Sequence, residues 1–212
     1  MKILFYANTD WYLYNFRRSL FLSLRDSGYE VVLVSPPGQY GRKFEELGFK
    51  WIPAPMDRRS LNPLKELTLI WWLSRLMEKQ GIDIMHNFTI KCVLLGSLAA
   101  KIARVSCCVN AVAGMGYIYS SGEIKARILR PIVSILLRVA LSGDRTRLIL
   151  QNPDDAEFFE REKIIKVSHI KLIRSSGVDC NRFSPLDRNQ GLSKDSRKFR
   201  VALAARLLWD KG

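Results

Sequence analysis

Residues 2–35 read KILFYANTDWYLYNFRRSLFLSLRDSGYEVVLVS, and this stretch decides the fold. Lys2–Ala7 and Glu30–Ser35 are apolar runs of strand length, and Tyr14–Ser27 between them has apolar residues at helical spacing. Gly28 follows the helical segment as a stop signal. The stretch therefore predicts a strand, a helix and a second strand that runs parallel to the first.

The same alternation continues along the chain. Further strands are predicted at Phe49–Ile52, Ile82–His86, Cys107–Val112, Leu148–Gln151, Ile170–Ile173 and Val201–Ala204. Helices are predicted between them at Phe44–Leu47, Leu64–Lys79, Ile90–Ala103, Glu123–Leu141 and Asp154–Arg161. Strands that are apolar throughout and alternate with helices indicate a sheet covered on both faces. The fold class expected is therefore α/β, a doubly wound fold with a Rossmann-like, mostly parallel sheet.

Composition excludes several classes of protein. The chain has 212 residues, of which 48% are hydrophobic and 25% charged, so it can bury a core and is not disordered. Only four residues are cysteines, and no C-x-x-C pair or metal-ligand spacing occurs among them. We therefore expect reduced thiols, as in a cytoplasmic protein, and no metal site.

The net charge of +14 calls for an anionic partner, which could be nucleic acid, an anionic membrane or a phosphate-bearing substrate. Residues 111–150 hold six Lys or Arg against two Asp or Glu, and the basic residues are interleaved with Ile, Leu and Val. This mixture is typical of a basic amphipathic helix that lies on a membrane surface. No apolar run is long enough to cross a membrane, and Asn8 and Asp10 interrupt the first run too early for a signal peptide.

Ligand sites in parallel sheets lie where the strands end. The polar or glycine residues at such ends are Asn8, Asp10, His86, Lys91, Gly114 and Gly116. Side chains and amides of this kind can hold a phosphate or a sugar hydroxyl. Each also has a simpler interpretation. Asn8 and Asp10 could cap the following helix, and His86 could form a hydrogen bond with a nearby group of the protein. Lys91 could lie in solvent, and Gly114 and Gly116 could form a tight turn. Walker, G-x-G-x-x-G and nucleophile motifs are missing from the sequence.

The order of these motifs resembles the N-terminal half of the family 4 glycosyltransferases, which have the two-lobed GT-B fold. The resemblance covers the whole chain and is carried by KILFYANTDWYLYNFR, RDSGYEVVLVSPPG, IPAPMDRRSLNPLKEL, IDIMHNFTIKCVLLGSLAAKIAR, VNAVAGMGYIYSS, LILQNPDDAEFF and SSGVDCNRFSP…ALAARLLWDKG. The subgroup that looks most similar is the bacterial enzymes that build capsule, O-antigen or other glycans on polyprenyl carriers.

The resemblance implies a retaining transferase that moves a sugar from a nucleotide-sugar donor, usually UDP-linked, to a glycan or polyprenyl-phosphate-linked acceptor, without a metal or cofactor. It implies that His86 is the catalytic cleft residue, since the region VNAVAGMG lacks the histidine that many relatives have there. Substrate would contact Asn8, Asp10, Lys91, Gly114 and Gly116. Arg206 and Lys211 match the family element that holds the donor diphosphate.

The resemblance also implies a domain plan. Residues 1–185 would form the acceptor-binding domain, 186–198 a polar linker, and 199–212 the truncated start of a C-terminal donor-binding domain. Without that domain the chain is expected to be inactive alone. The expected location is cytoplasmic, at the inner face of the cell membrane, where the basic helix would contact anionic lipid.

Two alternatives remain open. The chain could be the acceptor subunit of a two-chain glycosyltransferase, although the terminal RLLWDKG argues against it because such a subunit needs no donor-lobe strand. It could instead be a basic nucleic-acid-binding module, which would require a clustered basic stripe with exposed aromatic residues. The dispersed charge counts against nucleic acid as a partner.

Overall fold

The computed structural model describes residues 1–114, 119, 122–180 and 183–184. The chain divides into two units, Met1–Gly177 and Val178–Gly212, and every element given below belongs to the first. The predicted strand Val201–Ala204, the linker and the start of a second domain lie outside the described residues.

The described core is a seven-stranded sheet in the order β3-β2-β1-β4-β5-β6-β7, with every neighbouring pair parallel. The strands are β1 Lys2–Tyr6, β2 Glu30–Ser35, β3 Lys50–Pro53, β4 Ile84–Phe88, β5 Cys107–Val112, β6 Thr146–Leu150 and β7 Ile170–Leu172. The chain builds outward from β1 to β3 and then returns to place β4 on the other side of β1. The strand order therefore reverses between β1 and β4, which is where a doubly wound sheet opens a ligand crevice.

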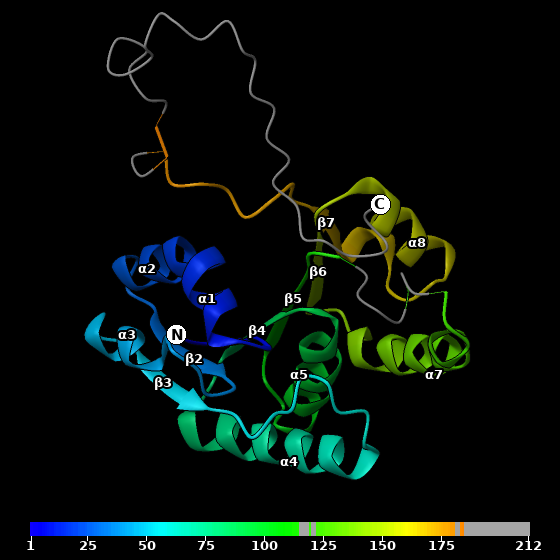
Figure 1. The fold of residues 1–212 in the computed structure, drawn as a ribbon, viewed down its shortest axis with the longest axis horizontal. Coiled ribbons are helices and arrows are strands. Elements are labelled where there is room, and N and C mark those ends of the chain that lie inside the picture. Colours follow the sequence, from blue (N-terminus) through cyan, green and yellow to red (C-terminus); the bar gives the residue numbers. More distant parts are fainter. Residues whose placement is uncertain (115–118, 120–121, 181–182, 185–212) are drawn as a thin grey trace, which may run out of the picture. The chain divides into compact units, whose positions relative to one another are not determined.

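Helices cover both faces of this sheet (Figure 1). They are α1 Asp10–Phe16, α2 Arg18–Asp26, α3 Gly41–Glu46, α4 Pro63–Gln80, α5 Ile90–Ile102, α7 Ile124–Leu141 and α8 Pro153–Arg161, with a 3-10 turn η1 at Val167–His169. Helices α1 to α3 pack on one face around the buried side chains of Phe5, Phe21 and Phe44. Helices α4, α5 and α7 lie in a row on the other face, with α5 in contact with both neighbours.

Helix α5 packs directly against β4 at Gly96. A Cβ atom at this position would overlap the side-chain oxygen of Asn87 in β4. The small gap holds a buried polar cluster in which Asn87 Nδ2 and Ser97 Oγ each donate to Asn110 Oδ1 over 2.9 Å. Buried polar groups of this kind are stable when they are paired with one another.

The predicted α/β class and parallel sheet are confirmed, but several predicted bounds are wrong; for example, α3 begins three residues and β6 two residues earlier than predicted. The segment Tyr14–Ser27 is not one helix, because α1 and α2 are separated at Arg17, whose backbone (φ −123°, ψ 0°) is not helical. The strand predicted at Ile82–His86 begins and ends two residues later. His86 therefore lies in the middle of β4, and its side chain faces the α1–α2 layer instead of the loop.

The cysteines are free thiols, as predicted, but they differ in burial. Cys92 and Cys108 are buried, Cys107 is half-buried and Cys180 is exposed. Burial raises the pKa of the Cys92 thiol to about 12, so this thiol stays protonated and behaves as a core side chain.

Candidate functional site

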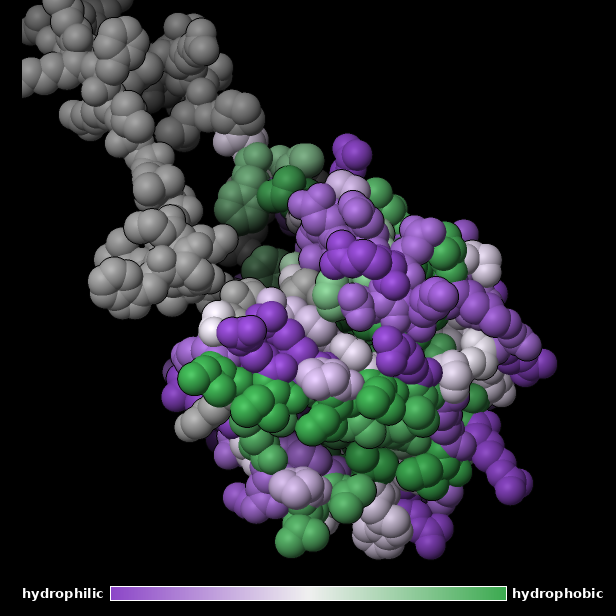
Figure 2. Space-filling view, turned by 90° about the vertical axis from the view of Figure 1, so that its right-hand side faces the viewer, coloured by the Kyte–Doolittle hydropathy of each residue, from purple (hydrophilic) through white to green (hydrophobic). Residues whose placement is uncertain are grey.

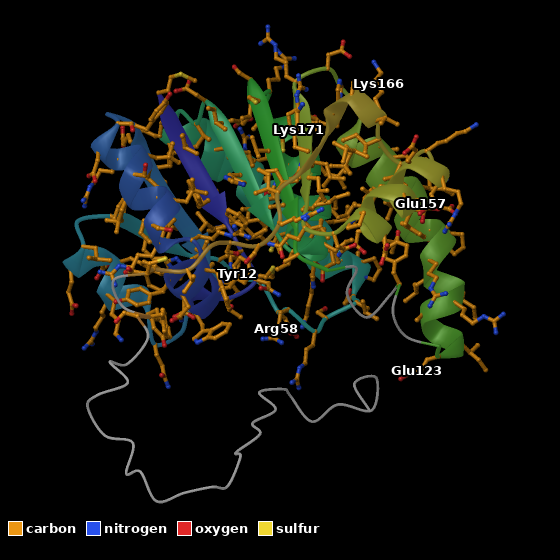
Figure 3. The ribbon with its side chains drawn as sticks, turned by 90° about the horizontal axis from the view of Figure 1, so that it is seen from above. Tyr12, Arg58, Glu123, Glu157, Lys166 and Lys171 are labelled. Carbon is orange, nitrogen blue, oxygen red and sulfur yellow. The ribbon has the colours of Figure 1, made fainter. Side chains whose placement is uncertain are left out.

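The residues at the carboxyl ends of the strands come from three separate loops. In Figure 3, Tyr12 in α1, Arg58 before α4 and Glu123 before α7 lie toward this end of the molecule, whereas Lys166 lies toward the opposite end. Asn8 lies two residues after the end of β1 and is half-buried, and its side chain has no hydrogen-bond partner among the described residues of the first unit. Thr9 caps α1 by accepting a hydrogen bond from the Tyr12 amide over 3.1 Å.

Asp10 is buried and fastens two loops together. Its carboxylate accepts hydrogen bonds from the Trp11 amide over 2.7 Å and from the Tyr40 amide over 2.6 Å. A Cβ atom at Gly38 would overlap this carboxylate, so the loop after β2 can approach only because residue 38 is glycine. The visible role of Asp10 is therefore to join the loop after β1 to the loop after β2.

His86 is packed between aromatic rings in the α1–α2 layer. Its ring centroid lies 4.2 Å from that of Phe88 and 5.1 Å from that of Phe5. Burial, and then the nearby charge of Arg17, lower the pKa of the imidazole to about 3. His86 is therefore neutral near pH 7 and can donate and accept a hydrogen bond, but it does not act there as a protonated acid. Its Nε2 atom is buried and has no partner among the described residues.

Lys91, in the first turn of α5, is neither in solvent nor free. Its ammonium donates to the backbone oxygens of Asp57 and Ser60, each over 2.8 Å, and to Glu66 Oε1 over 2.7 Å. An ammonium has three donors, so this arrangement uses all of them. Lys91 thus holds the segment before α4 against α5, and a phosphate would have to displace one of these partners.

Gly114 follows β5 and is exposed, and a Cβ atom there would meet nothing within 4 Å. The fold around the described residues does not require glycine at this position, which leaves open space beside the backbone. Gly116, Arg206 and Lys211 lie outside the described residues, so their predicted contacts stay predictions.

Arg17 and Glu66 belong to this edge of the sheet, but the sequence did not identify them. Arg17 is buried: its Nη2 atom donates to the Tyr12 hydroxyl over 2.7 Å, and its guanidinium carbon lies 4.6 Å from the Phe88 ring centroid. Arg17 comes four residues after the buried Leu13 and four before the buried Phe21, so it lies on the helix face that packs against the sheet. Glu66 is 25 residues from Lys91, and no local motif links the two.

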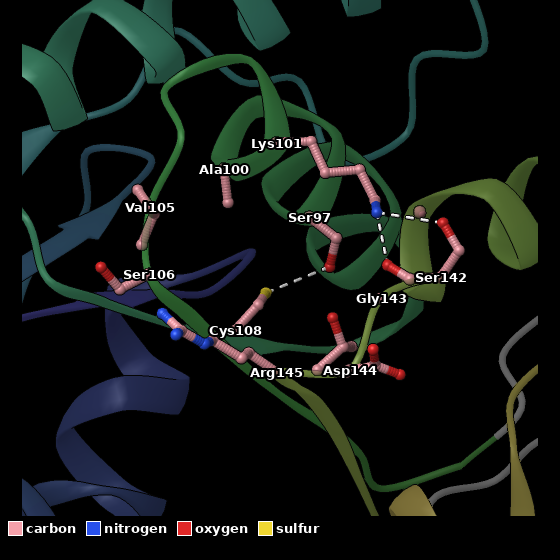
Figure 4. A pocket seen from close by; sticks show the side chains of 12 residues that line it. Ser97, Ala100, Lys101, Val105, Ser106, Cys108, Ser142, Gly143, Asp144 and Arg145 are labelled. Atoms are coloured by element: carbon pink, nitrogen blue, oxygen red, sulfur yellow. Dashed lines mark hydrogen bonds between the residues drawn. The ribbon is translucent and has the colours of Figure 1, made fainter.

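A cavity of about 220 Å³ lies at the opposite, amino-terminal ends of β5 and β6 (Figure 4). Lys101 reaches across it and donates to the hydroxyl of Ser142 over 3.0 Å and to the Ser142 carbonyl oxygen. This cavity is separate from the predicted site. Within the described residues, no group of three or more His, Cys, Asp or Glu side chains is placed to hold a metal ion.

The surface of α7 carries exposed apolar side chains along its length. They recur at helical spacing and are 40–74% exposed: Ile124, Ile128, Ile132, Ile135, Leu136 and Val139. Figure 2 shows hydrophobic side chains gathered in a band on the side of the molecule where α7 lies. None of the described helices is both long enough and apolar enough to cross a membrane.

Comparisons with known proteins agree with this architecture. A family model described as "Glycosyl transferase 4-like" matches residues 2–152. An N,N'-diacetylbacillosaminyl-diphospho-undecaprenol alpha-1,3-N-acetylgalactosaminyltransferase of Campylobacter jejuni is 28% identical over 219 residues, which cover 100% of this chain and 58% of the relative. A UDP-Gal:alpha-D-GlcNAc-diphosphoundecaprenol alpha-1,3-galactosyltransferase of Escherichia coli is 29% identical over 60% of this chain and 31% of its own length.

Among solved structures, sucrose-phosphate synthase of Thermosynechococcus elongatus superposes with a TM-score of 0.62 and 12% identity, over 88% of this chain and 51% of that one. At this identity the likeness concerns the fold alone. The chain thus spans little more than half the length of the proteins that it matches over most of its own length.

Proposed function

The chain belongs to the glycosyl transferase 4-like family, and from this premise we propose that it is the acceptor-binding lobe of a retaining glycosyltransferase. The enzyme would move a sugar from a nucleotide-sugar donor, a UDP-sugar, to a glycan on a polyprenyl diphosphate. The observation that carries the proposal is the alignment of the whole chain with the Campylobacter jejuni protein, whose name specifies a diphospho-undecaprenol-linked acceptor.

The carboxyl edge of the sheet supplies groups suited to an acceptor. The amide of Asn8 and the neutral imidazole of His86 can form hydrogen bonds with sugar hydroxyls, and the open space at Gly114 lets a ligand approach the backbone. His86 would position the acceptor through a hydrogen bond to one of the acceptor's oxygen atoms. Asp10 and Lys91 would shape the site by holding its loops, and in the complete enzyme either could reach substrate only by exchanging a partner.

The donor side of the reaction belongs to a second lobe. Arg206 and Lys211 would stabilise the departing nucleotide diphosphate as two cations beside developing negative charge. The chain alone would then lack most of the donor site and would be inactive.

The acceptor's lipid would keep the enzyme on the cytoplasmic face of a membrane. The apolar surface of α7, which also bears exposed Arg127 and Arg138, would lie on anionic phospholipid. Helix α4 would add Trp71, which is exposed, whereas Trp72 packs on the core and would contribute less.

The test is a transfer assay with the full-length protein that contains this chain. UDP-sugars would be offered one at a time with a sugar-diphospho-undecaprenol acceptor, and the product identified by mass spectrometry. We expect one sugar to be added to the lipid-linked acceptor, with the anomeric configuration of the donor retained. Transfer only to acceptors without the lipid diphosphate, or tight UDP binding by the 212-residue chain alone, would overturn the proposed arrangement.

A further inference from the structure

Arg17 lies at the junction of α1 and α2, on the face that these helices turn to the sheet. The backbone leaves the helical conformation at this residue alone, and α2 begins at the next one. Its neighbours Phe16 and Arg18 are exposed, whereas the side chain of Arg17 is turned onto the sheet and is only 9% exposed. A cation therefore takes a place on the buried face of α1–α2 where Leu13 and Phe21, four residues away on either side, are apolar.

Among the described residues, the surroundings of Arg17 supply aromatic rings and one hydrogen-bond acceptor but no negative charge. The guanidinium lies against the rings of Phe88 and Tyr12, and Nη2 donates to the Tyr12 hydroxyl. Its Nε atom is buried without a partner, and no carboxylate of the described residues in Met1–Gly177 forms an ion pair with it. A buried cation without an anion is unfavourable unless something supplies the missing charge.

His86 has a second buried atom without a hydrogen-bond partner in the described part of the chain, and its imidazole lies against the same ring of Phe88. It is also 9% exposed, its Nε2 atom has no partner, and its ring lies 4.2 Å from Phe88. Because the imidazole is neutral, it adds a hydrogen-bonding atom beside the guanidinium without adding a second positive charge. Two nine-tenths buried polar groups thus meet Phe88, the last residue of β4, at the carboxyl edge of the sheet.

These groups fit a phosphate oxygen better than a sugar hydroxyl. A guanidinium offers a planar pair of donors that matches phosphate geometry, and its attraction to an anion is stronger in a site with little water. The ligand would replace the Tyr12 hydroxyl on Nη2, and Tyr12 is itself only partly buried.

We propose that Arg17, with His86 beside it, binds a phosphate of the substrate diphosphate at the carboxyl end of β4. The inference rests on the proposed function for the source of that phosphate, which is the polyprenyl diphosphate of the acceptor. Arg17 is a binding residue in this assignment, and His86 orients the bound group. A nucleoside diphosphate has the same chemistry and is the competing source.

The experiment measures binding of farnesyl diphosphate to the 212-residue chain by calorimetry, with farnesol and UDP as parallel ligands. Arg17→Gln removes the cation and keeps most of its volume. Arg18→Gln is the matched control, because it removes the adjacent exposed cation and the same net charge. We expect farnesyl diphosphate to bind at least about tenfold more weakly to Arg17→Gln and less than about twofold more weakly to Arg18→Gln. Farnesol binding should not depend on Arg17.

Equal losses in the two variants, or no loss in Arg17→Gln, would overturn the site. If Arg17→Gln weakens the binding of UDP but not that of farnesyl diphosphate, the assignment of the bound phosphate to the acceptor is wrong. If Arg17→Gln fails to fold, the Nε–H signal of Arg17 in the wild-type chain must still shift when farnesyl diphosphate is added, and an unchanged signal would contradict the site. Failure of sugar transfer together with Arg17-dependent diphosphate binding would overturn the proposed function and leave the site in place.

Discussion

The imidazole of His86 lies between the rings of Phe5 and Phe88, where a charged form is unfavourable. The pKa is about 3 in the folded chain against an ordinary value of 6.5. Between these values the unfolded chain binds a proton that the folded chain does not bind. The free energy of unfolding should therefore fall as the pH drops below about 6.5, by up to about 1.4 kcal/mol per pH unit.

We predict that His86→Phe removes this dependence, because a phenyl ring fills the same aromatic site and does not titrate. Urea denaturation at pH 7 and pH 5 should show about 2 kcal/mol less loss of stability in the variant than in the wild type. His169→Gln, which removes the other histidine, is the control and should retain the wild-type loss. An equal pH dependence in wild type and His86→Phe would show that the buried imidazole already carries a proton at pH 5.

At the scale of residues, the sequence identified candidates but not their partners. Asp10, His86 and Lys91 were selected by their places after strands, and the structure puts Asp10 and Lys91 near the carboxyl edge, whereas His86 lies within β4. Their partners are distant in sequence: Tyr40 holds Asp10, and Glu66 holds Lys91. Because these pairings form only when loops from different strands meet, spacing along the chain could not predict them.

At the scale of elements, the segment between β3 and α4 depends on α5 for its position. Lys91 holds the backbone oxygens of Asp57 and Ser60, and both Lys91 and Glu66 are largely shielded from water. Hydrogen bonds from a charged group of this kind contribute about 1.5–3 kcal/mol each. Arg58 and Arg59 within the segment are exposed and are cleavage sites for trypsin.

We predict that Lys91→Met releases this segment and accelerates tryptic cleavage after Arg58 and Arg59 at least about fivefold under native conditions. Mass spectrometry of the early fragments would measure it. Lys101→Met is the matched control, since it removes a lysine of the same helix that holds Ser142 at the other end of the sheet. Similar acceleration in both variants would mean that the whole fold, and not this segment, had been loosened.

Most elements were predictable because their apolar patterns are long and regular. The strands β2 and β5 have the predicted bounds, and α7 differs by one residue at its start. The break at Arg17 was not predictable, because Phe16, Leu20 and Leu24 continue the helical spacing across it. The interruption is a single residue wide, and the hydrogen bonds from the Arg17 amide to Leu13 and from the Phe21 amide to Arg17 keep helical spacing across it.

At the scale of the whole lobe, an exposed apolar surface on α7 is unfavourable in water unless a partner covers it. Removing two of its isoleucines should weaken membrane binding more than it alters the fold. We predict that Ile128→Ser/Ile132→Ser binds phosphatidylglycerol vesicles at least about tenfold more weakly, a loss of about 1.4 kcal/mol. Sedimentation with vesicles would measure it.

The matched control is Ile102→Ser/Val167→Ser, which removes two similarly exposed apolar side chains away from α7. This variant should bind vesicles as the wild type does. Binding of the wild type to vesicles should also weaken as the salt concentration rises, because salt screens the attraction between the basic side chains of α7 and anionic lipid. If both variants bind vesicles as tightly as the wild type, α7 is not the surface through which the chain binds a membrane.

The close approach of α5 to the sheet at Gly96 has a consequence for redesign of this lobe. Helices α4 and α7 can each be given new outward-facing side chains independently, since each covers its own part of the sheet. Position 96 offers no such freedom, because a single methyl group there would lift α5 and disturb both neighbours together. An engineer who redesigns this scaffold should therefore vary its outer surfaces and keep Gly96 in α5 unchanged.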